Sequence, residues 1–220
     1  MAKLSLFYPL TPYRINQGWG VNGEYYRANG INILGHNGID LGVYHGQPVY
    51  ASHDGTAFYE QDDSQGQGVV IISDKAYDYK GGQSFFKTIY WHLCDPLKEP
   101  QHASPIYKFS QGANNGKGMQ VKAGDLIGFA DNTGFSSGDH THFGLKPIRS
   151  GQAPTSGDAP DIGIGAWINV EANNGYSGAI DPTPFWNGHV ATDAAKVLAN
   201  LTLQVSLLQQ VINLLLKFKK

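Results

Sequence analysis

The chain has 220 residues, of which 41% are hydrophobic and 15% are charged, so it has enough apolar sequence to bury one substantial core. Its formal net charge of −2 provides no basic surface of the kind that binds nucleic acid, and no nucleic-acid partner is expected. The single cysteine, Cys94, excludes an internal disulfide and is expected to be a buried small residue rather than a nucleophile.

The first ten residues predict a strand rather than a secretory signal. They contain one basic residue and a short apolar stretch, but they lack a small-residue cleavage site, and Pro9 and Pro12 interrupt the stretch early. We therefore expect a protein that is made in the cytoplasm without a signal peptide.

Short runs rich in β-branched and aromatic residues recur through residues 5–148, and this region has no helical period of useful length. The expected strands lie at 49–52, 56–59, 68–73 and 85–91, and on both sides of a turn within 121–128. Asp54 and Gly55 separate the first two strands and predict a hairpin turn. The fold class is therefore mainly β, with a compact antiparallel sheet domain over residues 1–188.

Two segments, at about 95–118 and 149–180, look like insertions into this domain. Both are rich in Pro, Gly, Asn, Ser or Asp and have no sustained hydrophobic pattern. Long loops inside a compact domain are usually functional walls or poorly ordered segments. Because each insertion follows a histidine-containing segment directly, we expect both to border the same cleft.

Residues 190–220 predict a separate C-terminal amphipathic α-helix. Thr192 or Asp193 can cap it, and neither Gly nor Pro interrupts the chain from Ala194 to about Lys217. Apolar residues alternate spacings of three and four along it, which is typical of a coiled-coil seam. The seam residues are Leu198, Leu201, Val205, Leu208, Ile212 and Leu215.

Three interpretations of this helix remain open. It can associate with copies of itself or with a partner, it can pack on its own domain, or it can contact a membrane. The absence of charge between Lys196 and Lys217 permits the membrane interpretation, but five Asn and Gln side chains in that stretch would put amides into hydrocarbon. We favour association, which makes residues 190–220 an assembly or attachment element.

Three other segments contain four of the eight histidines and one aspartate, which is the composition of a metal site. His36 and Asp40 lie in the first, His92 in the second, and His140 and His142 in the third. A catalytic zinc usually takes three imidazole or carboxylate ligands from the protein and leaves a fourth position for water. Two further histidines would then remain to handle protons, which points to hydrolysis.

Local geometry supports the convergence of each pair. If a strand begins at His140, then His140 and His142 project from one face while Thr141 points away. Gly35 and Gly38 disfavour a helix in the first segment and allow the backbone to bend there.

These segments resemble the M23 family of zinc endopeptidases, the lysostaphin-like enzymes. The resemblance covers roughly residues 14–147 and the Asp-Pro-Thr-Pro-Phe sequence at 181–185. The matching segments are Gln-Gly-Trp-Gly at 17–20, His-Asn-Gly-Ile-Asp at 36–40, Gly-Gln-Pro-Val-Tyr-Ala at 46–51, Asp-Gly at 54–55, Tyr-Trp-His-Leu at 90–93, Gly-Asp-Leu-Ile-Gly at 124–128, Asn-Thr-Gly-Phe-Ser-Ser-Gly at 132–138 and His-Thr-His at 140–142.

The resemblance implies a role for each residue of the site. The implied Zn²⁺ ligands are His36, Asp40 and His142, and the implied catalytic residues are His92 and His140. A neutral His140 would take a proton from the attacking water and pass it to the leaving amine. A hydrogen-donating His92 would stabilise the tetrahedral oxyanion, which is worth about 3–4 kcal/mol in comparable sites. How the two share the proton work stays open.

The implied function is a zinc metallo-endopeptidase that hydrolyses the peptide cross-links or stems of bacterial peptidoglycan. Asp139 and Thr141 stand where the family prefers proline and leucine, but neither change removes a ligand. The alternative is a non-catalytic zinc-binding structural or cell-wall-binding module of a particle. That alternative predicts a broken ligand set or a missing catalytic histidine, and this sequence shows neither.

A wall-cutting enzyme without a signal peptide needs lysis, a secretion device or packaging to reach its substrate. Together with the predicted self-associating helix, this favours a component of a phage virion or a phage-tail-like particle, such as a phage lysin.

The remaining histidines belong to no motif, and we expect them to be ordinary surface or core residues. They are His45, His53, His102 and His189.

Overall fold

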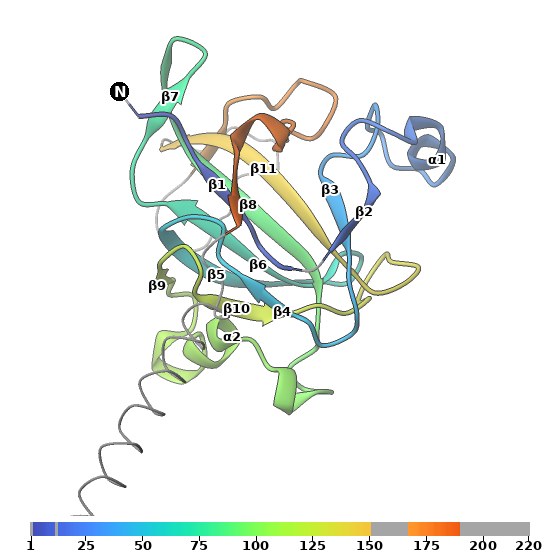
Figure 1. Ribbon diagram of the computed structural model, residues 1–220, viewed down its shortest axis with the longest axis vertical. Coiled ribbons are helices and arrows are strands. Elements are labelled where there is room, and N and C mark those ends of the chain that lie inside the picture. The colour runs from blue at the N-terminus through green and yellow to red at the C-terminus, as the bar shows by residue number, and fades with distance from the viewer. Residues whose placement is uncertain (1, 12, 151–166, 190–220) are drawn as a thin grey trace, which may run out of the picture.

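The structure, a computed structural model, describes residues 2–11, 13–150 and 167–189. An antiparallel central sheet dominates it, as the alternating apolar runs predict (Figure 1). In spatial order its strands are β2 (Arg14–Gln17), β3 (Ile39–Gly42), β11 (His140–Ser150), β8 (Gly82–Leu93), β6 (Gly66–Ser73), β5 (Gly55–Asp62) and β9 (Met119–Val121). β12 (Trp167–Asn169) pairs with β11, and β7 (Tyr77–Tyr79) pairs with β8. The predicted helix over 190–220 lies outside the described residues.

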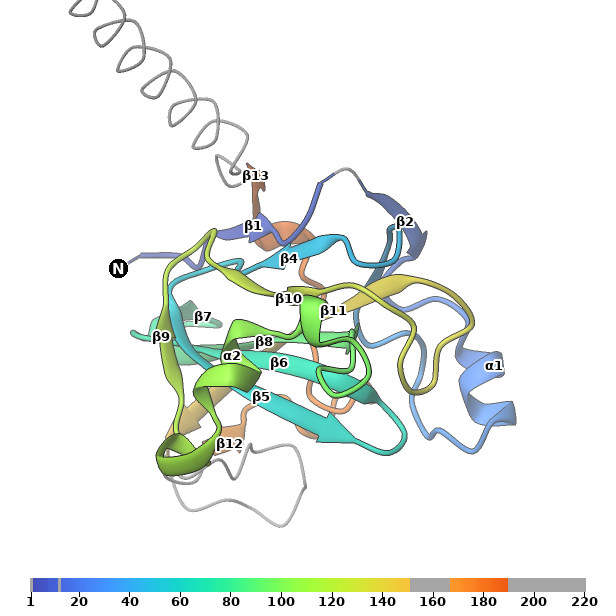
Figure 2. The ribbon, with the colours of Figure 1, turned by 90° about the horizontal axis from the view of Figure 1, so that it is seen from below.

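Two smaller sheets cover one face of the central sheet (Figure 2). In one, β4 (Pro48–Tyr50) runs antiparallel to β10 (Leu126–Phe129), and in the other, β1 (Leu6–Tyr8) runs parallel to β13 (Trp186–His189). The main core lies between these layers. It contains Leu6 and Ile127 from the small sheets, and Phe86, Tyr90 and Phe143 from the central sheet.

The opposite face of the central sheet contains both apolar and charged side chains. Along β8, Phe86 and Tyr90 belong to the main core, whereas Ile89 joins a second cluster with Val70 and Ile148. This alternation is the two-residue period of a strand. β8 therefore contributes to the main core on one side and to the groove and the second cluster on the other.

The hairpin predicted across Asp54 and Gly55 does not form, although both of its strands exist. β4 pairs with β10, whereas β5 pairs with β6 and β9, so the chain passes from one sheet to another between them. Asp54 does not close a turn between its neighbouring strands. Its carboxylate instead accepts the Ala123 N–H at 2.9 Å and lies 3.1 Å from Lys122 Nζ.

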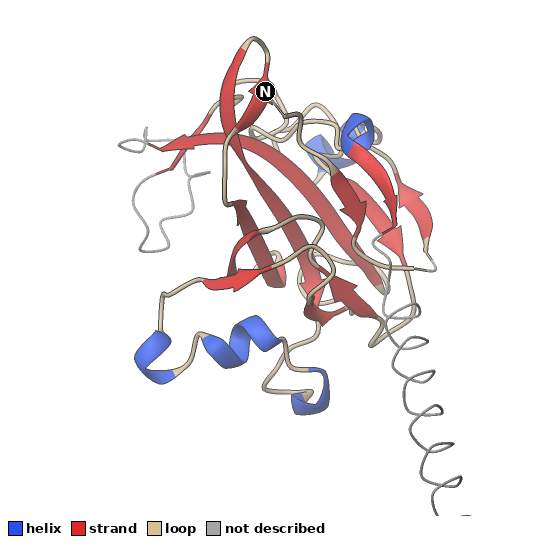
Figure 3. Ribbon diagram, turned by 60° about the vertical axis from the view of Figure 1, so that its left-hand side comes forward, coloured by secondary structure: helices blue, strands red, loops and turns tan. Residues whose placement is uncertain are grey.

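The first insertion also differs from its prediction, because it is partly helical and residues 95–118 do not line the main groove. It contains three short helices, which follow one another in Figure 3: η1 (Pro100–His102), α2 (Pro105–Phe109) and η2 (Gly112–Asn114). The Ser104 hydroxyl accepts the Ile106 N–H at the start of α2 and donates to the Ile127 carbonyl at 2.5 Å. Ser104 thus attaches the insertion to β10, away from the groove.

Two further short helices were not predicted: α1 (Gly23–Ala28) and η3 (Thr183–Phe185). In the second insertion, residues 151–166 lie outside the described part, and Ser177 reaches the main groove as predicted for this segment. Across the described ranges, no helix combines the length and the apolar character of a membrane span.

The buried His53 predicts a pH-dependent stability. Its Nδ1 lies 2.8 Å from the Asp54 carbonyl and donates to it, and its Nε2 accepts from the Thr88 hydroxyl at 2.9 Å. Burial lowers the pKa of His53, and the backbone hydrogen bond with Asp54 opposes this only partly. The folded chain therefore takes up a proton there at lower pH than the unfolded chain, whose pKa is about 6.5.

Stability from His53 should be complete above about pH 6.5 and should decline as the pH falls below it, by at most about 1.4 kcal/mol per pH unit. Urea unfolding of metal-free protein at several pH values, compared with His53→Gln, measures this contribution, because the other histidines are common to both proteins. Equal pH dependence in the two proteins would contradict the prediction.

Candidate metal centre and groove

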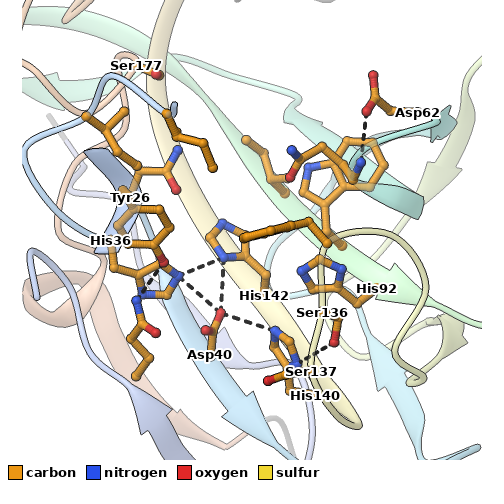
Figure 4. Close-up of a pocket in the computed structure, with 18 of the residues that line it drawn as sticks. Tyr26, His36, Asp40, Asp62, His92, Ser136, Ser137, His140, His142 and Ser177 are labelled. Carbon is orange, nitrogen blue, oxygen red and sulfur yellow. Dashed lines mark hydrogen bonds and ion pairs between the residues drawn. The ribbon is translucent and has the colours of Figure 1, made fainter. Parts of the chain in front are cut away.

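Strand pairing places the first two ligand candidates opposite each other. β3 and β11 are antiparallel neighbours, and their register sets Asp40 directly across from His142. His36 lies just before β3. The three donor atoms form a nearly equilateral triangle: His36 Nε2 lies 3.0 Å from His142 Nδ1, and Asp40 Oδ1 lies 3.1 Å from each of these nitrogens (Figure 4).

This triangle fits a zinc ion. Zinc bound by nitrogen and oxygen at about 2.0–2.2 Å in a tetrahedron separates its donor atoms by roughly 3.3–3.6 Å, so a small outward movement admits the ion. The other nitrogen of His36, Nδ1, lies 3.0 Å from the Gly18 carbonyl and donates to it, which leaves the Nε2 lone pair for a metal. Three protein ligands leave one position open.

Electrostatics also prepare the site for a cation. Burial by itself favours the neutral form of Asp40, but the contacts of its carboxylate with the His142 and His36 rings outweigh this and hold the pKa of the carboxyl well below its usual range. Burial lowers the pKa of His142. Asp40 is therefore charged and His142 is neutral at ordinary pH, which are the protonation states that bind a metal.

Gly38 gives the His142 ring its space. A Cβ atom at residue 38 would lie 2.6 Å from His142 Cε1 and 2.5 Å from the Phe143 carbonyl oxygen. Neither neighbour can retreat easily, since one is a ligand ring and the other is backbone of β11. The glycine within the His-Asn-Gly-Ile-Asp segment is thus required by the packing of β3 against β11.

We expect Gly38→Ala to weaken zinc binding by about 10–100-fold, the range seen when the surroundings of a ligand are disturbed. The reason is that the new methyl group displaces the His142 ring. Titration against a competing chelator measures the affinity. Gly82→Ala is the matched control, because Gly82 lies outside the groove and a Cβ atom there meets only the Tyr79 carbonyl oxygen, at 3.8 Å. Equal affinities in the two variants would contradict the prediction.

His92 enters the same site because β8 is irregular there. The pairing of β8 with β6 passes from Leu93 opposite Gln67 to Trp91 opposite Gly68, so His92 is an extra residue, and its φ is +66°. Such a bulge redirects a side chain. Trp91 and His92 would point to opposite faces of a regular strand, but here both line the groove.

The two further histidines are oriented by backbone carbonyls. His92 Nδ1 lies 2.7 Å from the Thr133 carbonyl, and His140 Nδ1 lies 2.7 Å from the Gly138 carbonyl. Each ring therefore keeps its proton on Nδ1 and presents Nε2 as an acceptor when neutral. Burial, aided by the nearby His140 and His142, lowers the pKa of His92 to about 4.

These two rings lie beside the ligand triangle and beside each other. Their centroids are 4.6 Å apart, and His140 Nε2 is 3.6 Å from Asp40 Oδ1. The Ser136 hydroxyl lies 3.2 Å from His140 Nδ1 and so faces the same nitrogen as the Gly138 carbonyl. The arrangement can move a proton at Nε2 of either ring next to a bound cation.

The five side chains lie in a groove of about 600 Å³. Tyr25, Tyr26 and Phe135 provide aromatic surface in it, and Tyr26 lies parallel to the His36 ring at 6.0 Å. The lining contributed by β5, β8 and β11 contains charged residues of both signs. These are Glu60, Asp62, Lys87 and Lys146.

Comparisons with known proteins find one metalloprotease relative and several similar solved structures. No model of a known protein family matches the sequence. Over 133 residues the chain is 29% identical to an uncharacterized metalloprotease from Haemophilus influenzae; the match covers 60% of this chain and 21% of that protein, so the chain spans about a fifth of that relative.

The solved structures similar to this chain include a zinc-containing peptidase from Vibrio cholerae, with 25% identity, 66% of this chain and 37% of that chain covered, and a TM-score of 0.47. They also include the catalytic domain of lysostaphin from Staphylococcus simulans, with 21% identity and a TM-score of 0.42. That match covers 83% of this chain and 91% of the lysostaphin domain. A third is the catalytic domain of the prophage-encoded M23 protein EnpA from Enterococcus faecalis. It has 21% identity and a TM-score of 0.41, and the match covers 64% of this chain and 87% of that chain. The chain is thus similar to known peptidases, which include a metalloprotease, lysostaphin and an M23 protein.

In the structure, all five residues singled out from the sequence lie together at one groove. His36, Asp40 and His142 form a possible metal site, and His92 and His140 are beside it. Sequence reasoning missed the residues that orient them. Thr133 and Gly138 lie in the matching segment at 132–138, but they act through backbone carbonyls, which any residue type supplies, so the sequence does not reveal this role.

Three of the histidines that belong to no motif, His45, His53 and His102, are of two kinds in the structure. His53 is a buried residue with both ring nitrogens hydrogen-bonded, as expected for an ordinary core histidine. His45 and His102, in contrast, lie together in a second group of potential metal ligands. That group includes Cys94, which is buried as predicted.

Proposed function

We propose that this protein is a zinc metallo-endopeptidase that hydrolyses the peptide part of bacterial peptidoglycan. One observation carries the proposal: three converging ligands leave an open metal position beside two imidazoles whose Nε2 atoms are available to handle protons. The metalloprotease relative supports the reaction class, and the similarity to lysostaphin, an antimicrobial peptidase, supports a bacterial wall substrate.

The ligand residues His36, Asp40 and His142 would hold the zinc, which when bound supplies a Lewis acid for a peptide carbonyl and for water. His140 Nε2, with its lone pair facing the centre, accepts the proton of the attacking water. The Gly138 carbonyl keeps the ring in this tautomer. The same atom then returns the proton to the leaving amine, which is general acid–base catalysis by one residue.

His92 would act in a second role that depends on its protonation. In its neutral form it presents an acceptor at Nε2, because its Nδ1 proton is engaged by Thr133. It becomes a donor to the oxyanion only after it takes up a proton itself. Since its pKa is lowered to about 4, that uptake is expected only when negative charge develops nearby during the reaction.

The groove has a lining that suits a polar peptide. Aromatic rings provide apolar surface in one part, and Glu60, Lys87 and Lys146 lie in another. The two lysines are buried and interact electrostatically with Glu60. These residues of β5, β8 and β11 would therefore form a polar wall beside the peptide, while the histidines act on the bond that is hydrolysed.

The decisive experiment is digestion of purified wall. We expect the protein to release new amino termini, a chelator to stop the release, and added zinc to restore it. Release of reducing sugar ends without new amines would overturn the peptidase assignment. Zinc binding without any cleavage of wall from several bacterial types would instead support the non-catalytic particle module.

We further propose that the protein is made in the cytoplasm and acts from a phage virion or phage-tail-like particle, assembled through residues 190–220. The support is the seam of apolar residues in that segment of the sequence. We expect the full chain to sediment as an oligomer and the chain ending at residue 189 to sediment as a monomer. An unchanged monomer in both cases would contradict the association.

A further inference from the structure

A second set of potential metal ligands lies where the first insertion leaves the central sheet. It comprises His45, Cys94, Glu99 and His102, and one donor atom from each of these residues lies within 4.8 Å of all the others. They come from three places in the chain: the loop before β4, the residue directly after β8, and the η1 turn of the insertion. None of them belongs to the site described above.

The η1 turn explains how Glu99 and His102 meet. The His102 N–H donates to the Glu99 carbonyl at 2.9 Å, and residues three apart in a 3₁₀ turn lie on one face. Glu99 Oε2 lies 3.0 Å from His102 Nδ1 and 2.8 Å from His45 Nε2. Two imidazole nitrogens therefore converge on a single carboxylate oxygen.

His45 is oriented like a metal-binding histidine whose second ring nitrogen is hydrogen-bonded to a carboxylate. Its second nitrogen, Nδ1, lies 3.0 Å from Asp131 Oδ1. A histidine that binds a metal through one nitrogen usually donates its other N–H to a carboxylate or a carbonyl, which directs the free lone pair at the ion. Asp131 fixes His45 in this tautomer and turns Nε2 toward the cluster.

Cys94 is held at the base of the cluster by the backbone. Its N–H donates to the Phe129 carbonyl at 2.8 Å, its side chain is 1% exposed, and its Sγ lies 3.4 Å from the Ala130 carbonyl. The Gly46 N–H donates to the same Ala130 carbonyl at 2.8 Å. The loop that contains His45 is therefore attached to the same strand end as Cys94.

We propose that His45, Cys94, Glu99 and His102 form a second zinc site, closed and structural in kind. One thiolate, two imidazoles and one carboxylate are a donor set that zinc accepts, and tetrahedral zinc spaces such donors by roughly 3.3–3.8 Å. Four protein ligands leave no position for water, unlike the triangle of His36, Asp40 and His142. The ion would attach the insertion to the end of β8.

The site lies directly behind the catalytic histidines. The Asp131 N–H donates to the His92 carbonyl at 2.9 Å, and the His140 N–H donates to the Asp131 carbonyl at 3.1 Å. The residue that orients His45 is thus also bonded to the backbone of both. Loss of the second zinc should therefore loosen the floor of the groove, although none of its ligands lines the groove.

Cobalt substitution tests the proposal on the full chain. We expect metal-free protein to bind two equivalents of Co²⁺, one of which produces the near-ultraviolet charge-transfer band of a cobalt–thiolate bond. Cys94 is the single cysteine of the sequence, and the first site contains no sulfur, so the band can arise only from the second site. A single equivalent without this band would overturn the proposal and leave only hydrogen bonds between Glu99 and the two histidines.

Variants assign the two equivalents. Cys94→Ser and His102→Ala should each lose the band and keep the first-site metal, whereas His36→Ala should keep the band and lose the other equivalent. Asp131→Ala should keep the band but weaken the second site by about 10–100-fold, because it removes only the support of His45. Retention of the band at full affinity in His102→Ala would exclude the proposed ligand set, and circular dichroism of each variant shows that it has folded.

Discussion

His140→Ala should reduce wall cleavage by about 10²–10⁴-fold, the contribution of a positioned general acid or base, and should leave the zinc content per chain unchanged. The reason is that the proposed mechanism uses Nε2 of His140 for proton transfer, whereas the ligand triangle consists of His36, Asp40 and His142. Released amines measure cleavage, and metal analysis of the same sample measures zinc.

His53→Ala is a useful comparison, because His53 is a histidine that lies outside the groove. It should retain both cleavage and zinc. If His140→Ala lost zinc instead, His140 would be a ligand, and the division between metal binding and proton transfer would be wrong.

Asp40→Ala should remove about one zinc per chain and reduce cleavage to the level of the chelated protein. Asp40 is the only anionic ligand, and its oxygen lies 3.1 Å from each of the two ligand nitrogens. Without it, two neutral imidazoles remain, and two ligands are too few for a catalytic zinc.

Zinc content and cleavage of Asp40→Ala should be compared with those of Asp62→Ala. Asp62 lines the same groove, but its carboxylate accepts from the Ser64 and Gln65 backbone rather than facing the ligands. Asp62→Ala should keep its zinc. Full zinc occupancy in Asp40→Ala would contradict the proposed ligand set.

The sequence predicted where the strands lie, but it did not predict how the strands pair or where the insertion packs. Alternating apolar runs identify the strands, since a strand with one buried face must repeat every two residues. The hairpin across Asp54 failed because hairpin signals are local, whereas the Asp54 carboxylate bonds Ala123, which is 69 residues away. The docking of the insertion through Ser104 on β10 is equally non-local.

The proposed second zinc site was also not predicted from the sequence, because its ligands come from distant parts of the chain. His45 and His102 match no motif, and the cluster joins residues from the β4 loop, the end of β8 and a 3₁₀ turn. A sequence pattern can mark site residues only when they recur at a fixed spacing, as His140 and His142 do. The sequence pattern also does not predict how His92 is oriented, because the bulge at this residue, with φ of +66°, is not indicated by the residue types around it.

The sequence alone indicates the strand segments and, through its resemblance to a known family, the groups of the candidate site: two imidazoles and a carboxylate for a metal, and two more imidazoles for protons. That these groups meet follows only from the packing of the strands. His36 and His142 are 106 residues apart, and the register of β3 against β11 sets their distance. Register follows from burial of a whole sheet face, which is a property of all the packed strands together and of no single segment.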